Sequence, residues 1–124
     1  MATKTAYPFR VEPQEVDFSL RITLVALGGN ILNIAGIDAH TKGFGVDALN
    51  KDNFSWVLSR IAFEFDYRPE EYVKYEIATW ISDYGRMLST RNFELTDQTG
   101  VCFGRVVSQW CMLDLSLIHI SEPT

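Results

Sequence analysis

The sequence has few basic residues, few histidines and only two cysteines. Its 124 residues include 11 Lys and Arg against 16 Asp and Glu, a net charge of −5, and the basic residues are scattered singly. Because nucleic-acid binding requires clustered positive charge, DNA and RNA are excluded as partners. Cys102 and Cys111 lie an odd number of positions apart, so on one strand they would point to opposite faces. They are interpreted as reduced thiols, and without CxxC spacing we predict no metal site and no cofactor.

The sequence also lacks a long, uninterrupted hydrophobic run. Residues 20–37 are the most apolar stretch, but Arg21, Thr23, Asn30 and Asn33 interrupt it, whereas a membrane-spanning helix needs about 20 predominantly apolar residues. The first residues, MATKTAYPFRVEPQ, contain no apolar segment of the kind that a signal peptide requires. We therefore predict a soluble, cytoplasmic protein with no membrane partner.

What the sequence does have is the composition of one globular domain with an enclosed helix. Hydrophobic residues make up 47% and charged residues 22%, which are ordinary values for a folded protein of a single domain. Apolar residues at intervals of three or four predict a helix over residues 20–37: Leu20, Leu24, Leu27, Ile31 and Ile34. Asp17 or Ser19 is the expected N-cap and Gly36 the expected end. Gly28 and Gly29 each cost about 1 kcal/mol relative to alanine inside a helix, which indicates close approach to a sheet or a ligand.

Alternating patterns predict the strands. Residues 7–11 are expected to form an edge strand, because Pro8 cannot donate to a ladder. After residue 53, four antiparallel strands are predicted to begin near Phe54, Lys74, Met87 and Val101. In the first of these strands one face is expected to carry Val57, Ile61, Phe63 and Phe65, and the other Trp56, Leu58, Arg60 and Ala62. One long helix followed by such strands favours an α+β class, a single hotdog domain in which an antiparallel β-sheet wraps a long central helix.

The last ten residues, LSLIHISEPT, break the alternating pattern. They resemble a sequencing-library adapter translated in frame and are excluded from fold reasoning. Residues 115–124 are therefore expected to be a non-native tail. Residues 1–114 are expected to be one N-terminal hotdog domain, cut from a gene whose C-terminal part is missing. On this interpretation His119 is not native and His40 is the remaining histidine.

Four segments resemble the acyl-carrier-protein (ACP) thioesterases of plants and bacteria. They are NILNIAGIDAHTKGFGVD (30–47), WVLSRIAFEFDYRP (56–69), TWISDYGRMLSTRNFELTD (79–97) and SQWCMLDL (108–115). The resemblance implies an enzyme of fatty acid biosynthesis that hydrolyses the thioester of a fatty acyl group on ACP and releases the free fatty acid. It also implies two tandem hotdog domains, with this chain as the N-terminal one and an Asn and His catalytic motif on the second. No such motif occurs here, so this chain alone is predicted to be inactive.

No catalytic residue is assigned in this sequence. Thioester hydrolysis needs a base or nucleophile and donors aimed at the developing oxyanion. His40, two residues after Asp38, and Asp17 at the start of the helix are the acid–base candidates. A solvated helix end and an N-cap explain these residues more simply.

Substrate contacts are expected between the helix and the sheet, where an acyl chain gains about 0.8 kcal/mol for each buried methylene. The candidates, each of which could equally be a core residue, are Leu27, Gly29, Ile31, Ile34, Trp56, Arg60, Phe63, Ile77 and Trp80. Arg60 matches an arginine of the family. It is expected either to contact the phosphopantetheine arm of ACP or to pair with an acidic residue across the sheet.

Two alternatives stay open beside the family resemblance. A stand-alone hotdog acyl-CoA thioesterase would work as a homodimer or tetramer and would depend on Asp17, Asp38 or His40. A non-catalytic acyl-binding domain would need none of them. The expected partners are ACP carrying a fatty acyl chain and either a second hotdog domain or a second copy of the chain.

Overall fold

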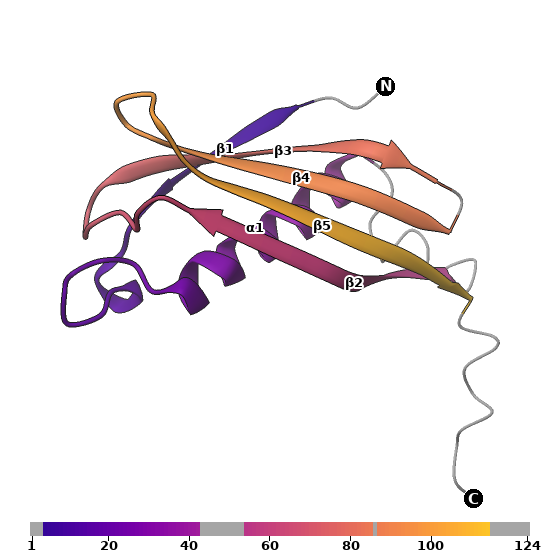
Figure 1. Cartoon of the computed structure of the whole chain (residues 1–124), viewed down its shortest axis with the longest axis horizontal. Coiled ribbons are helices and arrows are strands. Elements are labelled where there is room, and N and C mark those ends of the chain that lie inside the picture. The colour runs from indigo at the N-terminus through magenta and orange to yellow at the C-terminus, as the bar shows by residue number, and fades with distance from the viewer. Residues whose placement is uncertain (1–3, 43–53, 86, 115–124) are drawn as a thin grey trace, which may run out of the picture.

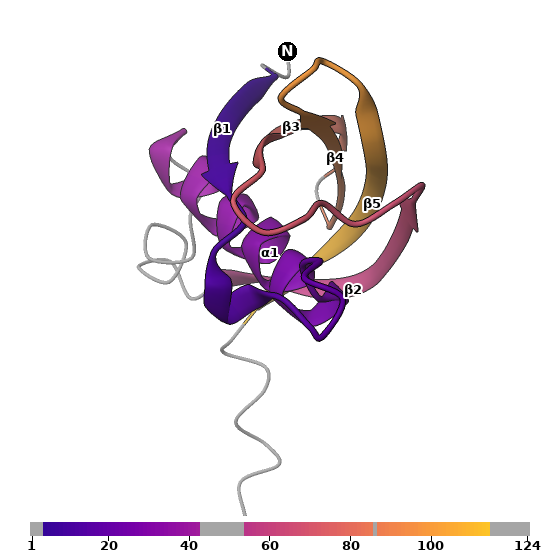
Figure 2. The ribbon, with the colours of Figure 1, turned by 90° about the vertical axis from the view of Figure 1, so that its left-hand side faces the viewer.

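The computed structural model describes residues 4–42, 54–85 and 87–114, in which one long helix lies inside a curved antiparallel sheet (Figure 1). The elements are β1 (Thr5–Arg10), a single 3-10 turn (Pro13–Glu15), α1 (Leu24–Thr41), β2 (Phe54–Phe65), β3 (Lys74–Tyr84), β4 (Leu88–Asp97) and β5 (Cys102–Asp114). The sheet order is β1-β3-β4-β5-β2, and Figure 2 shows these strands curling around α1. The α+β hotdog fold is thus confirmed. None of the helices in the described segments has the length and apolar character needed to cross a membrane.

The helix begins and ends about four residues later than the sequence predicts. Thr23 is its N-cap, with the side-chain oxygen accepting a hydrogen bond from the Ala26 backbone. The predicted caps Asp17 and Ser19 are wrong, because the Asp17 carboxylate instead accepts a hydrogen bond from the Ser19 backbone N–H and closes a separate turn. That turn holds Leu20 at φ 63°, outside helical geometry. The predicted end at Gly36 is also wrong, since α1 continues to Thr41.

The strands agree closely with the alternating pattern. β2 and β3 begin at Phe54 and Lys74 as predicted, and β4 and β5 begin one residue after the predicted starts. β1 is an edge strand that pairs with β3, with Pro8 opposite Glu76. β2 forms the opposite edge of the sheet.

A β-bulge divides β2 into two halves. The register against β5 shifts between Leu58 and Arg60, so that Leu58 faces Trp110 while Ile61 faces Ser108. Because Ser108 is buried, this register places the side chains of Leu58 and Ile61 together on the inner face. The predicted grouping is therefore wrong in the first half of the strand: Val57 moves to the outer face with Arg60.

The hydrophobic core fills the space between α1 and the inner face of the sheet. It contains Leu27, Ile31 and Ile34 from the helix, together with the strand residues Ile77, Phe93, Leu95, Phe103 and Val106. Tyr75 joins the core, stacks on Phe9 at a centroid distance of 5.4 Å and contacts the edge of the Phe103 ring. The core fixes the helix against the sheet and so determines which side chains remain accessible on the inner face.

Candidate functional site

Four of the predicted substrate contacts meet in the core. Leu27, Ile31 and Ile34 of α1 and Ile77 of β3 all belong to one buried cluster. Each is at most 3% exposed, so these side chains are core residues with almost no surface open to a ligand. Direct access for a ligand would require the core to open.

The two helical glycines differ in their surroundings. A Cβ on Gly28 would lie 3.8 Å from the Phe63 ring, whereas a Cβ on Gly29 would meet nothing within 4 Å. The close approach to the sheet that the glycine pair predicts is therefore made by Gly28, and Gly29 lies on the exposed side of α1. Phe63 is 44% exposed, so its ring borders accessible surface beside the helix.

The inner face of β2 and β5 beyond the bulge forms a second apolar surface. Its members, here called the inner strip, are Trp56, Leu58, Trp110 and Met112, which pair across the two strands as Trp56 with Met112 and Leu58 with Trp110. All four are half-buried. Sequence reasoning proposed Trp56 alone as a substrate contact, because the bulge that brings Leu58 and Trp56 to the inner face leaves no pattern in the chain.

Arg60 and Trp80 lie on the outer face of the sheet. Arg60 is exposed and pairs with Gln109. Trp80 pairs with Asn92, and the Lys4 ammonium lies 4.8 Å from its ring centroid while bonding to Glu94. The sequence predicts both residues between the helix and the sheet, but the structure places them on the opposite face of the sheet.

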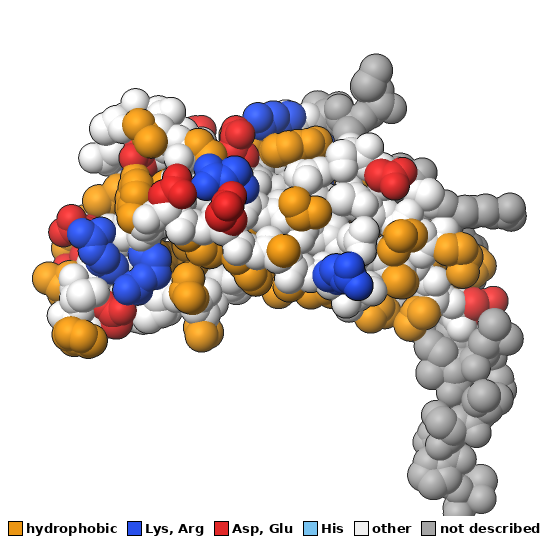
Figure 3. Space-filling model, viewed as in Figure 1, with side chains coloured by type: hydrophobic (Ala, Val, Ile, Leu, Met, Phe, Trp, Pro, Cys, Tyr) orange, Lys and Arg blue, Asp and Glu red, His pale blue; other side chains and the backbone are white. Residues whose placement is uncertain are grey.

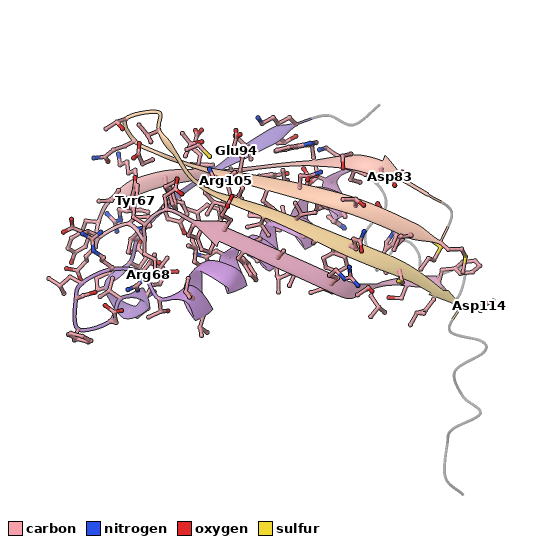
Figure 4. All side chains as sticks on the ribbon, viewed as in Figure 1. Tyr67, Arg68, Asp83, Glu94, Arg105 and Asp114 are labelled. Carbon is pink, nitrogen blue, oxygen red and sulfur yellow. The ribbon has the colours of Figure 1, made fainter. Side chains whose placement is uncertain are left out.

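Charge is unevenly distributed on the outer face. In Figure 3 acidic and basic side chains gather near the β4–β5 hairpin, and hydrophobic side chains gather toward the end of β5. Glu94 and Arg105 mark the charged end in Figure 4. Arg105 pairs with Glu64 at 2.8 Å and with Asp66 at 3.1 Å.

A buried polar cluster joins α1 to three strands. The Asp38 carboxylate accepts hydrogen bonds from the Tyr7 hydroxyl at 2.7 Å, from Arg91 Nη1 at 2.7 Å and from Lys42 Nζ at 2.9 Å. Arg91 also donates to Thr79 Oγ1 at 3.1 Å. Asp38 and Arg91 are 1% and 5% exposed. These five residues are here called the polar cluster. Asp38 was considered only as an acid–base candidate, and its contact with Arg91 was not predicted, because the two residues are far apart in sequence.

The polar cluster shifts the pKa values of two of its members. Burial acts to raise the pKa of Asp38, but the hydrogen bonds from Tyr7, Lys42 and Arg91 outweigh it and hold that pKa below its usual value. Burial, together with the neighbouring Asp38 carboxylate, raises the pKa of the Tyr7 hydroxyl to about 12. Asp38 therefore stays ionised at neutral pH. A carboxylate whose pKa is lowered is a weak base, whereas a general base works best with a pKa near the operating pH.

The remaining acid–base candidates are not arranged for catalysis either. Asp17 accepts hydrogen bonds from Ser19 and pairs with Arg68 at 2.9 Å, and these contacts hold its pKa well below its usual range. Arg68 lies near the start of α1 (Figure 4). His40 is exposed on α1 while Asp38 points into the core. Among the described residues, no group of three or more His, Cys, Asp and Glu could hold a metal ion.

Comparison with known proteins identifies the family. The model of the acyl-ACP thioesterase N-terminal domain matches residues 2–122. The oleoyl-ACP thioesterase 2 of Arabidopsis thaliana chloroplasts is 27% identical over 123 residues, which are 94% of this chain and 34% of that protein. The crystal structure of an acyl-ACP thioesterase from Bacteroides thetaiotaomicron is 42% identical, with a TM-score of 0.88 over 90% of this chain and 46% of its own.

A second solved structure, the 12:0-ACP thioesterase from Umbellularia californica, has a TM-score of 0.80 at 20% identity and shares the fold over 90% of this chain and 43% of its own. The chain spans about a third of the curated relative and less than half of either solved structure. Members of this family are hydrolases that act on thioesters. From the family match and the hotdog fold together, we conclude that the chain belongs to the acyl-ACP thioesterase family and corresponds to its N-terminal domain.

Proposed function

We propose that this chain is the acyl-binding half of an enzyme that hydrolyses fatty acyl-ACP and releases free fatty acid for fatty acid biosynthesis. The observation that carries this proposal is the inner strip, a half-buried row of aromatic and aliphatic side chains on the inner face of the sheet of a family domain. An acyl chain gains about 0.8 kcal/mol for each methylene removed from water. A surface of this kind therefore binds the tail of the substrate without polar contacts.

The catalytic groups are proposed to come from a second hotdog domain. The described acidic candidates Asp17 and Asp38 are held as anions by their partners, and His40 lies on the exposed side of α1. Thioester hydrolysis needs a base or nucleophile together with oxyanion donors. This chain supplies the tail-binding surface, and the second domain supplies the reacting groups.

Two exposed features support contact with that second domain. β2 is 12 residues long and pairs with β5 on one side, while its other side has no partner among the described strands. Long edge strands are normally covered or paired. The helix also exposes apolar side chains, namely Leu24, Val25, Leu32 and Ile37. A second hotdog domain, or in its absence a second copy of this chain, would cover both surfaces.

The experiment compares this chain alone with a polypeptide in which the C-terminal half is restored. We expect no hydrolysis of acyl-ACP above background from the chain alone and release of free fatty acid from the restored enzyme. His40→Ala in the restored enzyme is the matched control and should retain hydrolysis. Hydrolysis by the chain alone that disappears in His40→Ala or Asp38→Asn would instead favour the stand-alone acyl-CoA thioesterase. A cytoplasmic location stays a prediction, and the curated plant relatives are named as chloroplastic.

A further inference from the structure

A cation and an anion lie at the two ends of one row of side chains across the outer face of the sheet. From β2 to β3 the row consists of residues that stand opposite one another in the strand register: Arg60, Gln109, Thr90 and Asp83. Paired residues of neighbouring strands share a face of the sheet, so Asp83 faces outward with Arg60. Both side chains are exposed, and Asp83 is seen on β3 in Figure 4.

These two charges are not neutralised within the part of the chain that the structure describes. Neither side chain takes part in an ion pair or a hydrogen bond with another described residue. Neighbouring strands lie about 4.8 Å apart, so the three steps from β2 to β3 separate the two residues by about 14 Å along the row. Arg60 and Asp83 therefore cannot pair with each other inside one chain.

Exposed apolar side chains flank the charged row on both sides. Val57 and Leu88, which both pair with Cys111, lie toward the end of β5, and Val107 lies on the other side of the row. Val57, Leu88 and Val107 are 43%, 41% and 46% exposed. Figure 3 shows the hydrophobic side chains that gather toward the end of β5. Apolar side chains grouped in this way on a surface mark a protein–protein contact.

The order of charges along the row selects the partner. A partner with charge of one sign would be attracted at one end of the row and repelled at the other. A twofold contact brings the same surface together from both sides. When the twofold axis runs along the strands between β4 and β5, the second copy presents the row reversed. Arg60 of each copy then lies opposite Asp83 of the other, and the two polar residues between them also face each other.

We propose that two copies of this chain pack back to back through the outer faces of their sheets, with Arg60 of each copy paired with Asp83 of the other. Sheets packed face to face keep their strands within about 30° of each other, and an axis along the strands satisfies this geometry. Figure 2 shows the sheet curling around α1. The copies therefore lie nearest over the middle of the sheet, and the long Arg60 side chain spans the wider gap at its edge. This contact uses a different surface from the unpaired side of β2 and the exposed side of α1.

The test follows the mass of the 124-residue chain by sedimentation velocity over a range of protein concentrations. All chains carry Val25→Glu, which places a charge on the exposed side of α1, where Val25 is 87% exposed. This substitution opposes association through the helix, so the contact between outer faces is measured by itself. We expect this parent chain to form a dimer whose population rises with concentration.

The variants reverse one charge at a time. Arg60→Asp places like charges opposite each other twice in the dimer and is expected to raise the Kd about tenfold or more, and Asp83→Arg should do the same. An equal mixture of the two variants should form a heterodimer with about the Kd of the parent, because each position again faces the opposite charge. The matched control is Lys74→Asp, an exposed residue at the other end of β3, which should leave the Kd unchanged.

Three outcomes would overturn the inference. The first is a parent chain that stays monomeric, and the second is a dimer whose Kd neither reversal changes. The third is a mixture of the two variants that associates no better than either variant alone. A restored two-domain enzyme that stays monomeric would show that its second domain covers this face in place of a second copy. Hydrolysis of acyl-ACP by the restored enzyme is measured separately, so the loss of this contact leaves the proposed function intact.

Discussion

Asp38 shows how one residue can hold several elements together. Its carboxylate is almost completely buried, yet it receives hydrogen bonds from β1, from the residue that follows α1 and from β4. No described side-chain nitrogen or oxygen that is buried lacks a hydrogen-bond partner. Burying an ion pair contributes little by itself, but removing one partner of it is costly, about 3–5 kcal/mol. The charge of Asp38 is therefore required by the fold once Arg91 is buried beside it.

The stability of the chain should decline in acid, in part through Asp38. Because its pKa is lower in the folded state than in the unfolded chain, its contribution is present above the unfolded value of about 3.9 and is lost as pH falls through the folded value. Asp17 and Asp97 have pKa values lowered in the same direction. The Asp38→Asn variant is expected to have a free energy of unfolding about 3 kcal/mol lower than that of the unmodified chain at neutral pH. On acidification it should lose less further stability than the unmodified chain does.

Urea unfolding at a series of pH values from neutral to acid checks this expectation. Tyr7→Phe is the control, because it removes one hydrogen bond to Asp38 and keeps both cationic partners. Tyr7→Phe should lower the free energy of unfolding by about 1 kcal/mol and should keep the pH dependence of the unmodified chain. An Asp38→Asn variant with the same acid dependence as the unmodified chain would contradict the role given to this carboxylate.

At the scale of elements, repeating side-chain patterns in the sequence predict the helix and the strands. Features that depend on the pairing of one strand with another are not visible in the sequence. The four strands after residue 53 begin within one residue of the predicted starts, and β1 begins two residues before its predicted start, because alternation is a local property of half-buried strands. Leu20 continues the helical spacing but lies in a turn closed by Asp17, so the start of α1 is displaced. The bulge in β2 and the contact between Asp38 and Arg91 depend on the register against other strands. Neither can be seen in a single segment.

The N-cap of α1 gives a direct test of the corrected helix start. Thr23→Ala removes the side-chain acceptor for the Ala26 N–H and is expected to lower the free energy of unfolding by about 1 kcal/mol. Ser19→Ala, at the cap that the sequence predicts, should cost less, since Ser19 caps no helix and its side chain is exposed. Thermal melts followed by circular dichroism would measure both. A larger loss from Ser19→Ala would place the start of the helix where the sequence predicts it.

For the whole molecule, the predicted boundary at residue 114 coincides with the last residue of β5. Residues 115–124, together with residues 1–3, 43–53 and 86, lie outside the described part of the chain. The interpretation of the tail as adapter-derived, and of residues 1–114 as one domain of a longer enzyme, therefore stays a prediction.

Deleting residues 115–124 tests that boundary. We expect an unchanged or slightly raised melting temperature, because the tail contains the apolar residues Ile118 and Ile120 for which no evolved partner is expected. Calorimetry of the two chain lengths makes the comparison, and Phe103→Ala serves as a positive control that removes a fully buried ring and costs about 3–5 kcal/mol. Since about 1 kcal/mol shifts the melting temperature of such a domain by several degrees, a fall of that size on deletion would show that the tail is part of the fold.

The strand order also has a consequence for how the chain is made. Among the described strands, β2 is the second to leave the ribosome, but its partner in the sheet is β5, the last of them. Until residues 102–114 have been synthesised, β2 and its aromatic side chains lack the strand with which β2 pairs in the folded sheet. Such unpaired apolar strands are prone to misassociate while the chain is incomplete. The end of β5 is therefore the earliest point at which the nascent sheet can close.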